Sequence, residues 1–406
     1  MMKEKLSTVA KTFTPSPIQQ LSLLAQRCNA INLAEGFPDF PAPHHIKAAG
    51  ISAINSDFNQ YRHVQGICDR LAEILKDTHG LEVDPLTDIA ICCGQTEAFA
   101  AATFSIIDPG DEVILFEPAF ETYGGCISLA GGVPVYVALD PPYWTLDAKK
   151  LLNSFTNRTK ALVLNSPHNP TGKVFTRDEL EVIAGACRMN DCLAVTDEVY
   201  EYVTYDGIKH VSLASLAGMQ ERTIITSSLS KTFSVTGWRI GWAIAPALIA
   251  STIKNIHIRL TDSAPAPFQE AALTALTCQP PYFESLRQDY ESKRDFLVKL
   301  LVGVGFRIRS KPQGSFFLFA ELPENCLLSD VECVKKLIEE AGVVAVPGCG
   351  FFPSISCPSE DSHTVAGNQF NYQNRFIRFA FCKSDATLSS AALKLGEFMK
   401  AVGPLG

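Results

Sequence analysis

A lysine in a hydroxyl-rich turn is the residue with the clearest chemical potential in this sequence. Lys231 follows a short β-branched segment, residues 223–227, which predicts a buried strand, so the lysine is expected at the carboxyl end of that strand. Ser228 precedes it by three residues, and Arg239 follows it by eight, beyond Gly237. An amine can form a Schiff base with an aldehyde, while hydroxyls and a guanidinium can hold a phosphate. The turn therefore predicts a site for a phosphorylated aldehyde.

Two other interpretations of this turn are open. A lysine near a strand end is commonly a solvated surface residue. The spacing from Ser228 to Lys231 also matches the Ser-x-x-Lys signature of penicillin-recognising serine enzymes. The Ser-Asp-Asn and Lys-Thr-Gly tripeptides that accompany that signature are absent from the sequence, which argues against the second alternative.

Two further motifs follow predicted strands, at the place where ligands bind in open α/β sheets. Gly94, Gln95 and Thr96 open a helix after the strand predicted at residues 88–93, and backbone N–H groups at such a helix start suit a phosphate. Asn169 lies in a proline-flanked turn at residues 165–172. We expect this asparagine to donate a hydrogen bond to a ligand oxygen, although a purely structural turn is the simpler alternative.

A carboxylate ends another predicted strand, residues 193–197. Asp197 follows a run of apolar residues, and a buried carboxylate is costly unless it is paired. Pairing with the protonated nitrogen of a pyridine ring would offset that cost and would let the ring accept electrons from a substrate. Tyr200, three residues further on, could reach a ring hydroxyl. The alternative, an aspartate that only caps a helix, stays open.

The helices and strands predicted around these residues indicate an α/β fold. Strands are predicted at residues 88–93, 112–116, 133–138, 161–165, 193–197, 223–227 and 240–245. Most are continuous apolar runs, which are typical of strands covered on both faces, and helical segments lie between several of them. One such helix begins with the capping-box spacing Thr176-x-x-Glu179. The pattern predicts a mostly parallel central sheet flanked by helices.

The order of predicted helices and strands changes near residue 282. We expect a helix at 282–301, a strand at 315–320, a helix at 329–341, strands at 343–346 and 376–381, and a helix at 386–402. This is a smaller α+β unit, and the polar stretch 353–374 within it is predicted to be a loop. The predicted organisation is an N-terminal arm (1–40) that joins the small domain, a large domain (41–281) and a small domain (282–406).

Composition excludes several classes of protein. The chain has 406 residues, of which 47% are hydrophobic and 19% charged, as in ordinary globular proteins. Its net charge of -8 argues against nucleic acid or anionic membranes as partners. The 13 cysteines form no Cys-x-x-Cys pair and the eight histidines no His-Glu-x-x-His, so we expect no metal site. No targeting segment or membrane-length apolar run is evident, which favours a cytoplasmic location.

The motifs at 165–172, 197–200 and 228–239 together resemble those of the class I aminotransferases of pyridoxal-phosphate fold type I. The resemblance extends from about residue 31 to residue 386. Segments 31–41, 117–123 and 374–380 look most like the kynurenine/glutamine/methionine aminotransferase branch. The resemblance implies the fold type I architecture, with a large cofactor-binding domain and a smaller α+β domain, and pyridoxal 5'-phosphate as cofactor.

The resemblance also implies roles for the residues that match. Lys231 would hold the cofactor as a Schiff base and shuttle a proton, and Asp197 would pair with the pyridine nitrogen. The ring oxygen would be bound by Asn169 and Tyr200, the phosphate by Gly94, Gln95, Thr96, Ser228 and Arg239, and the ring face by Phe120. The substrate carboxylate would be bound by Arg378, with Gly36 and Asn169 beside it. Tyr61 would reach the phosphate of the neighbouring subunit, which implies a homodimer.

The implied reaction is a ping-pong transfer of an α-amino group to a 2-oxo acid. The donor would be an aromatic amino acid, methionine, glutamine or a kynurenine-like amino acid. Some members of the branch line the substrate pocket with a tryptophan near the start of the chain, and residues 15–19 hold none. Two alternatives share the fold, a C–S β-lyase and a lyase like aminocyclopropane-carboxylate synthase. A non-catalytic regulator on this scaffold usually carries a DNA-binding domain, for which the residues ahead of Gly36 are too few.

Overall fold

A seven-stranded sheet forms the centre of the larger part of the molecule in the computed structural model, which describes residues 3–13, 16–354 and 372–402. Its strands are β2 (Ile89–Cys92), β3 (Glu112–Glu117), β4 (Val133–Ala138), β5 (Thr159–Asn165), β6 (Leu193–Asp197), β7 (Thr223–Ser228) and β8 (Gly241–Ile244), in the order β2-β8-β7-β6-β5-β3-β4. Strand β8 is antiparallel to both of its neighbours, and the other pairs are parallel. The predicted mostly parallel α/β sheet is confirmed.

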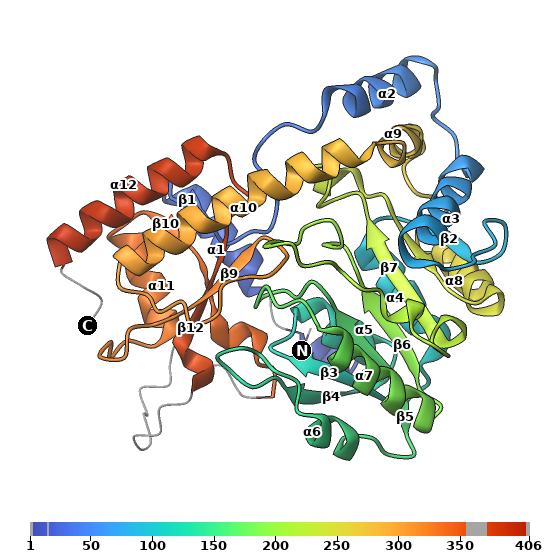
Figure 1. The fold of residues 1–406 in the computed structure, drawn as a ribbon, viewed down its shortest axis with the longest axis horizontal. Coiled ribbons are helices and arrows are strands. Elements are labelled where there is room, and N and C mark those ends of the chain that lie inside the picture. Colours follow the sequence, from blue (N-terminus) through green and yellow to red (C-terminus); the bar gives the residue numbers. More distant parts are fainter. Residues whose placement is uncertain (1–2, 14–15, 355–371, 403–406) are drawn as a thin grey trace.

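Helices cover both faces of this sheet (Figure 1). One face packs against α4 (Gln95–Ile106), α5 (Glu121–Leu129) and α8 (Ala247–Thr261). The other face packs against α3 (Gln65–His79), α7 (Arg177–Met189) and α9 (Ala266–Leu276), with α2 (His44–Asn55) lying on α9 and α6 (Ala148–Asn153) beside α7. Successive side chains of a strand point to opposite faces, so a strand between two helical layers is buried at every position. The all-buried pattern of β2, β3, β7 and β8 shows this directly.

The capping box predicted at the start of α7 is present. The Thr176 hydroxyl accepts a hydrogen bond from the backbone N–H of Glu179, and the Glu179 carboxylate accepts one from the backbone N–H of Thr176. These bonds satisfy donors that the first helical turn leaves without a partner.

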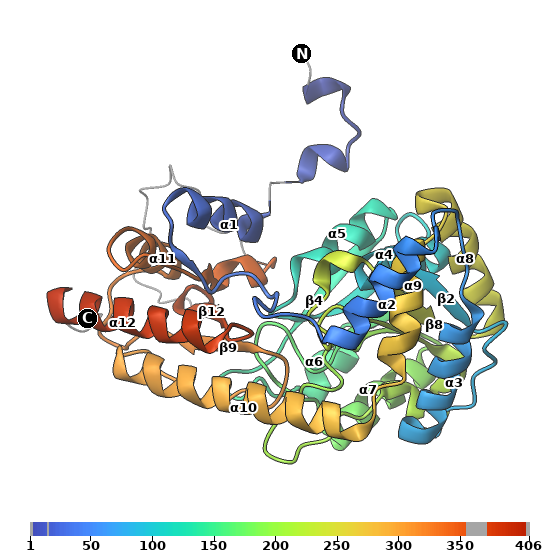
Figure 2. The ribbon, with the colours of Figure 1, turned by 90° about the horizontal axis from the view of Figure 1, so that it is seen from above.

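A three-stranded antiparallel sheet forms the centre of the smaller part. Its order is β11 (Val346–Pro347), β12 (Phe376–Ala380) and β9 (Phe317–Glu321), and α11 (Asp330–Glu339) and α12 (Asp385–Val402) belong to the same part. Helix α10 (Pro280–Gly303) runs from this part toward the larger one in both ribbon views (Figures 1 and 2).

One predicted strand is wrong. Residues 343–346 form two short strands, because β10 (Val343–Val344) pairs with β1 (Ile31–Asn32) while β11 pairs with β12. The apolar run is continuous, so nothing in the sequence marks the point where the chain changes partner. Helix α1 (Pro17–Arg27) contacts β1, β10 and β11, so the N-terminal segment lies against the smaller part. The predicted domain boundaries near residues 41 and 281 stay a prediction.

Most of the loop predicted at 353–374 lies outside the described residues. None of the helices that the structure describes combines the length and the apolar composition needed to cross a bilayer.

Candidate active site

A cavity of about 430 Å³ opens where β5, β6 and β7 end and α4 begins. It brings together most of the predicted site residues, namely Gly36, Gln95, Thr96, Phe120, Asn169, Asp197, Tyr200, Ser228, Lys231, Arg239 and Arg378. These residues come from both parts of the molecule. Gly94 lies just outside the lining as the N-cap residue of α4, and Tyr61 does not line the cavity.

Lys231 lies in the turn after β7 and opens into this cavity. Its Nζ donates a hydrogen bond to the carbonyl oxygen of Gly36 at 2.7 Å. Burial lowers the pKa of Lys231 to about 8, with the charges of Arg378 and Arg239 acting in the same direction and that of Asp197 opposing them. A lowered pKa increases the fraction of neutral amine at neutral pH, which is the nucleophilic form.

Asp197 is buried at the end of β6 with neutral donors around it. The Tyr123 hydroxyl donates to its Oδ2 at 2.7 Å, and the backbone N–H of Val199 donates to its Oδ1 at 3.2 Å. No lysine or arginine of the described residues forms an ion pair with it, and burial raises the pKa of Asp197 to about 6. A protonated ring nitrogen would supply the missing cation, so the site fits a pyridinium. Sequence analysis missed this contact of Tyr123.

Asn169 and Tyr200 lie beside this carboxylate. The backbone N–H of Asn169 donates to Oδ1 of Asn165 at 2.8 Å, which holds the turn after β5. The side-chain oxygen of Asn169 accepts from Arg378, so its amide nitrogen has no partner among the described residues. Tyr200 is buried with its ring edge against Phe316 at 5.0 Å between centroids. Both side chains therefore have a donor available toward the cavity.

The start of α4 and the guanidinium of Arg239 form the opposite end of the cavity. Gly94 has φ 81° and ψ 170°, and a Cβ there would lie 2.2 Å from Nη2 of Arg239. Arg239 donates to the carbonyl oxygens of Thr236 at 2.9 Å and Cys93 at 3.2 Å. A cation beside the free N–H groups of a helix start fits a phosphate.

Other residues near the start of α4 also line this end of the cavity. The side-chain amide of Gln95 donates to Oγ1 of Thr226 at 3.1 Å, so Gln95 offers the cavity its backbone N–H. The Ser228 hydroxyl accepts from the backbone N–H of Ser230 at 3.3 Å. Ser230 also lines the cavity and was missed from the sequence, although its place between Ser228 and Lys231 was a usable signal.

Arg378 is a buried cation without a carboxylate partner among the described residues. It is 1% exposed, and its Nη1 donates to Oδ1 of Asn169 at 2.9 Å and its Nη2 to the carbonyl oxygen of Ala34 at 2.7 Å. Its Nε is buried with no hydrogen-bond partner, and burial lowers its pKa to about 10. A Cβ on Gly36 would lie 2.4 Å from the ring of Phe317, so only glycine lets the backbone pass here. This arrangement fits a substrate carboxylate.

Two carboxylates that sequence analysis did not single out also line the cavity. Glu121 accepts from the Ser16 hydroxyl at 2.6 Å, and Glu35 accepts from the side-chain amide of Asn32 at 3.3 Å. Neither forms an ion pair with a described residue, and the charge of each opposes the effect of burial on the pKa of Arg378. They make this side of the cavity negative.

The absence of a metal site stays a prediction, and one cluster of the described residues bears on it. Atoms of Cys92, Glu97 and His257 that could bind a metal lie within 4.8 Å of one another. His257 Nδ1 contacts Glu97 at 2.9 Å, and Glu97 also accepts from the backbone N–H of Cys93 at 2.8 Å. The contact between Glu97 and His257 joins α4 to α8.

Tyr61 is 79% exposed and is not among the residues that line the cavity of its own chain. A role at the site of a neighbouring subunit therefore stays a prediction.

Comparison with known proteins identifies the family. The family model described as aminotransferase class I and II matches residues 29–389. The chain is 36% identical to kynurenine--oxoglutarate transaminase 1 of Homo sapiens, with 94% of this chain and 96% of that protein covered. It is 33% identical to methionine aminotransferase of Escherichia coli (strain K12), with 93% and 94% covered.

Comparison with solved structures identifies the same family. N-succinyldiaminopimelate aminotransferase from Mycobacterium tuberculosis superposes with a TM-score of 0.89 at 34% identity, covering 97% of this chain and 100% of that one. A methionine aminotransferase from Escherichia coli superposes with a TM-score of 0.87 at 31% identity, covering 97% and 99%. The chain therefore belongs to the class I and II aminotransferases, with the fold type I architecture, pyridoxal 5'-phosphate as cofactor and transamination between an amino acid and a 2-oxo acid as its reaction.

Proposed function

We propose that this aminotransferase prefers amino donors with uncharged side chains, of the aromatic, methionine, glutamine or kynurenine type. The observation that carries the proposal is the pair of unpaired carboxylates, Glu35 and Glu121, in the same cavity as Arg378. Arg378 attracts the α-carboxylate common to all amino donors. A second carboxylate on the substrate side chain would approach Glu35 and Glu121.

The expected discrimination follows from Coulomb's law. At an effective dielectric constant of about 20, two like charges roughly 9 Å apart repel by about 2 kcal/mol. This corresponds to roughly a thirtyfold preference for a neutral side chain. The names of two relatives, one for kynurenine and one for methionine, support a neutral donor. The name of the kynurenine relative also gives oxoglutarate, a dicarboxylate, so the proposal covers the amino donor and not the acceptor.

The residues of the cavity have different roles in the proposed reaction. Pyridoxal phosphate, when bound, supplies a ring that accepts electrons from the substrate α-carbon. Lys231 Nζ would hold the cofactor and would move the substrate α-proton, because its lowered pKa suits a base near neutral pH. Asp197 holds the ring nitrogen in its protonated form.

The remaining groups bind and orient. Asn169 and Tyr200 would hold the ring oxygen, and Phe120 would cover the ring. The phosphate is held by Gly94, Gln95, Thr96, Ser228 and Arg239. Arg378, with Gly36 and Asn169, fixes the α-carboxylate, which orients the α-proton toward Lys231.

We further propose a cytoplasmic homodimer in which Tyr61 completes the phosphate site of the neighbouring subunit. Support comes from the exposure of Tyr61 and of two apolar side chains on the preceding helix α2, Ile51 at 59% and Ile54 at 50%. Exposed apolar groups close together in one segment are typical of a contact surface.

A panel of amino donors against 2-oxobutyrate tests the substrate class. We expect kcat/KM for glutamine, methionine, phenylalanine and kynurenine to exceed that for aspartate and glutamate by about tenfold or more. Equal or higher values for the acidic donors would overturn the proposal. A parallel assay without any oxo acid measures pyruvate and ammonia release, and a rate there that matches transamination would favour the β-lyase alternative.

A further inference from the structure

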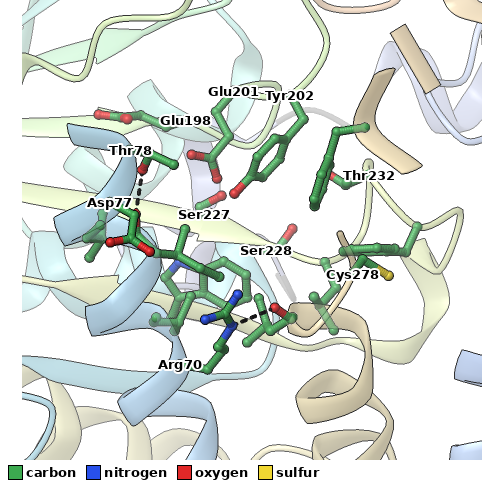
Figure 3. Close-up of a pocket in the computed structure, with 18 of the residues that line it drawn as sticks. Arg70, Asp77, Thr78, Glu198, Glu201, Tyr202, Ser227, Ser228, Thr232 and Cys278 are labelled. Atoms are coloured by element: carbon green, nitrogen blue, oxygen red, sulfur yellow. Dashed lines mark hydrogen bonds between the residues drawn. The ribbon is translucent and has the colours of Figure 1, made fainter. Parts of the chain in front are cut away.

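A second cavity, of about 320 Å³, lies beneath α3 on the face of the central sheet formed by β7 and β8 (Figure 3). The start of α10 closes another side of it. Its volume is in the range that holds small molecules. Ser228 lines both this cavity and the active-site cavity, so the two lie on either side of the end of β7.

The walls of this second cavity are mainly aromatic and aliphatic. Phe233, Trp242 and Phe283 line it, and the ring of Tyr202 stacks on Phe283 with centroids 4.3 Å apart. Flat aromatic walls accept an aromatic or branched aliphatic group.

A hydroxyl at the sheet side of the cavity has no protein partner. Ser227 is 3% exposed, and no described residue hydrogen-bonds its side chain. This hydroxyl is open to the cavity, so it can hydrogen-bond water or a polar group of a ligand. Figure 3 shows Ser227 and Ser228 between Tyr202 and Glu201 on one side and Arg70 on the other.

Charges of both signs are available in the lining. Glu201 has only His79 nearby, at 3.7 Å, and Arg287 forms no ion pair with a described residue. Burial raises the pKa of Tyr202, with Glu201 acting in the same direction and Arg70 opposing it, so the phenol lies within range of both charges.

Two other charged groups of the lining are already engaged. Glu198 accepts from Ser212 at 2.9 Å and contacts His210 at 2.7 Å. Arg70 pairs with Glu73 at 2.7 Å. Asp77 also lines the cavity and forms no ion pair with a described residue. The carboxylates of Glu201 and Asp77 and the guanidinium of Arg287, beside apolar walls, complement a zwitterion better than a ligand of net negative charge.

We propose that this cavity is a second binding site for an apolar amino acid in its zwitterionic form. The ammonium group lies toward Glu201, the carboxylate toward Arg287, and the side chain against the aromatic walls. Occupation alters how firmly the enzyme holds its cofactor, because the ligand contacts the strand end that carries Ser228. This coupling rests on the proposed role of Ser228 in phosphate binding, whereas binding itself does not.

Equilibrium dialysis of the holoenzyme with labelled 2-aminoindane-2-carboxylate tests the site. This aromatic amino acid has no α-hydrogen, so it cannot be transaminated. We expect two sites per chain, of which one changes the absorbance of the cofactor and the other does not. The absorbance titration reports the active site separately, so a failure of the proposed substrate preference is distinguishable from a failure here.

Two variants and a matched control locate the second site. Glu201→Gln and Arg287→Met should each weaken the silent site by about tenfold or more and leave the absorbance titration unchanged. Glu284→Gln removes a charge from the same helix as Arg287 but outside the cavity lining, and it should keep both sites. A single site in the wild-type enzyme, as expected if a second copy of the chain covers the cavity, would overturn the proposal, as would a silent site unaffected by both variants.

The coupling has its own measurement. The rate of cofactor release into excess apo-acceptor protein should change by about twofold or more when the silent site is saturated in the wild type, and by less in Glu201→Gln at the same ligand concentration. An unchanged rate in the wild type would refute the coupling.

Discussion

The replacement Asp197→Asn should stabilise the cofactor-free protein while it weakens cofactor binding. In the absence of the cofactor the carboxylate is buried with only a phenol and a backbone N–H as donors. Asparagine has nearly the same shape. Its oxygen can accept from the backbone N–H of Val199, while its amide nitrogen donates to the Tyr123 hydroxyl, which can also accept. Asparagine carries no charge, so it avoids the cost of burying one.

The magnitude follows from the pKa of Asp197, which is about 6 in the folded protein against an ordinary value of 3.8. Because the folded state binds this proton more tightly than the unfolded state, stability is lost as the pH rises from about 4 to about 6. The difference of roughly 2 pKa units corresponds to about 3 kcal/mol above pH 6. Weakening the bond with Tyr123 costs about 1 kcal/mol. The expected net gain at pH 7 is therefore about 2 kcal/mol.

Urea unfolding of the cofactor-free protein between pH 4 and pH 8 measures this gain. The wild type should lose stability relative to the variant across the window from pH 4 to pH 6, and the gap should then stay constant. When the cofactor is added, its stabilising effect should be smaller in the variant, because the protonated ring nitrogen no longer meets an anion. Transamination should fall as well.

Asp330→Asn is a matched control. Burial raises the pKa of Asp330 to about 6 as well, and its carboxylate accepts backbone N–H bonds from Cys349 and Val331, away from the cavity. Its replacement should change the pH dependence of unfolding and leave cofactor affinity unchanged. The reasoning is refuted if cofactor-free Asp197→Asn is no more stable than the wild type at pH 7 and shows the same pH dependence.

Three further predictions follow from single contacts. Arg378→Gln should lower kcat/KM for every amino donor by about thirtyfold or more, mainly through KM, because it removes a buried cation worth ~2–5 kcal/mol. Steady-state kinetics, with the cofactor absorbance unchanged, would show this. An unaltered KM would contradict it. Gly94→Ala should weaken cofactor binding by at least about tenfold in a spectroscopic titration, because its Cβ would clash with Arg239. Gly80→Ala is its control, since Gly80 also has a positive φ of 68° but nothing within 4 Å, and an equal loss of affinity in both variants would point to backbone strain alone. Glu121→Gln should raise kcat/KM for glutamate relative to glutamine by about fivefold in the donor panel, and an unchanged ratio would argue against electrostatic selection at this position.

Features that depend on neighbouring residues could be predicted from the sequence. The mainly apolar runs of β3, β4, β5, β6 and β7 place these strands to within two residues of their observed ends, because strands of a helix-covered sheet are rich in apolar residues. The capping box at Thr176 depends on a spacing of three residues and forms as predicted. The motifs around Asn169, Asp197 and Lys231 reach one cavity because the carboxyl ends of adjacent parallel strands meet at one edge of the sheet.

Contacts between residues far apart in the chain were decided only by the tertiary structure. Tyr123 bonds Asp197 across 74 positions, and neither residue signals the other. The apolar run at 343–346 divides between two sheets because β1 and β12, distant segments, each supply a partner. The negative side of the cavity arises because the loop holding Glu35 and the helix starting at Glu121 pack against the same hollow. Local spacing sets which groups a strand end presents, whereas packing of the two parts of the molecule sets which charges those groups meet.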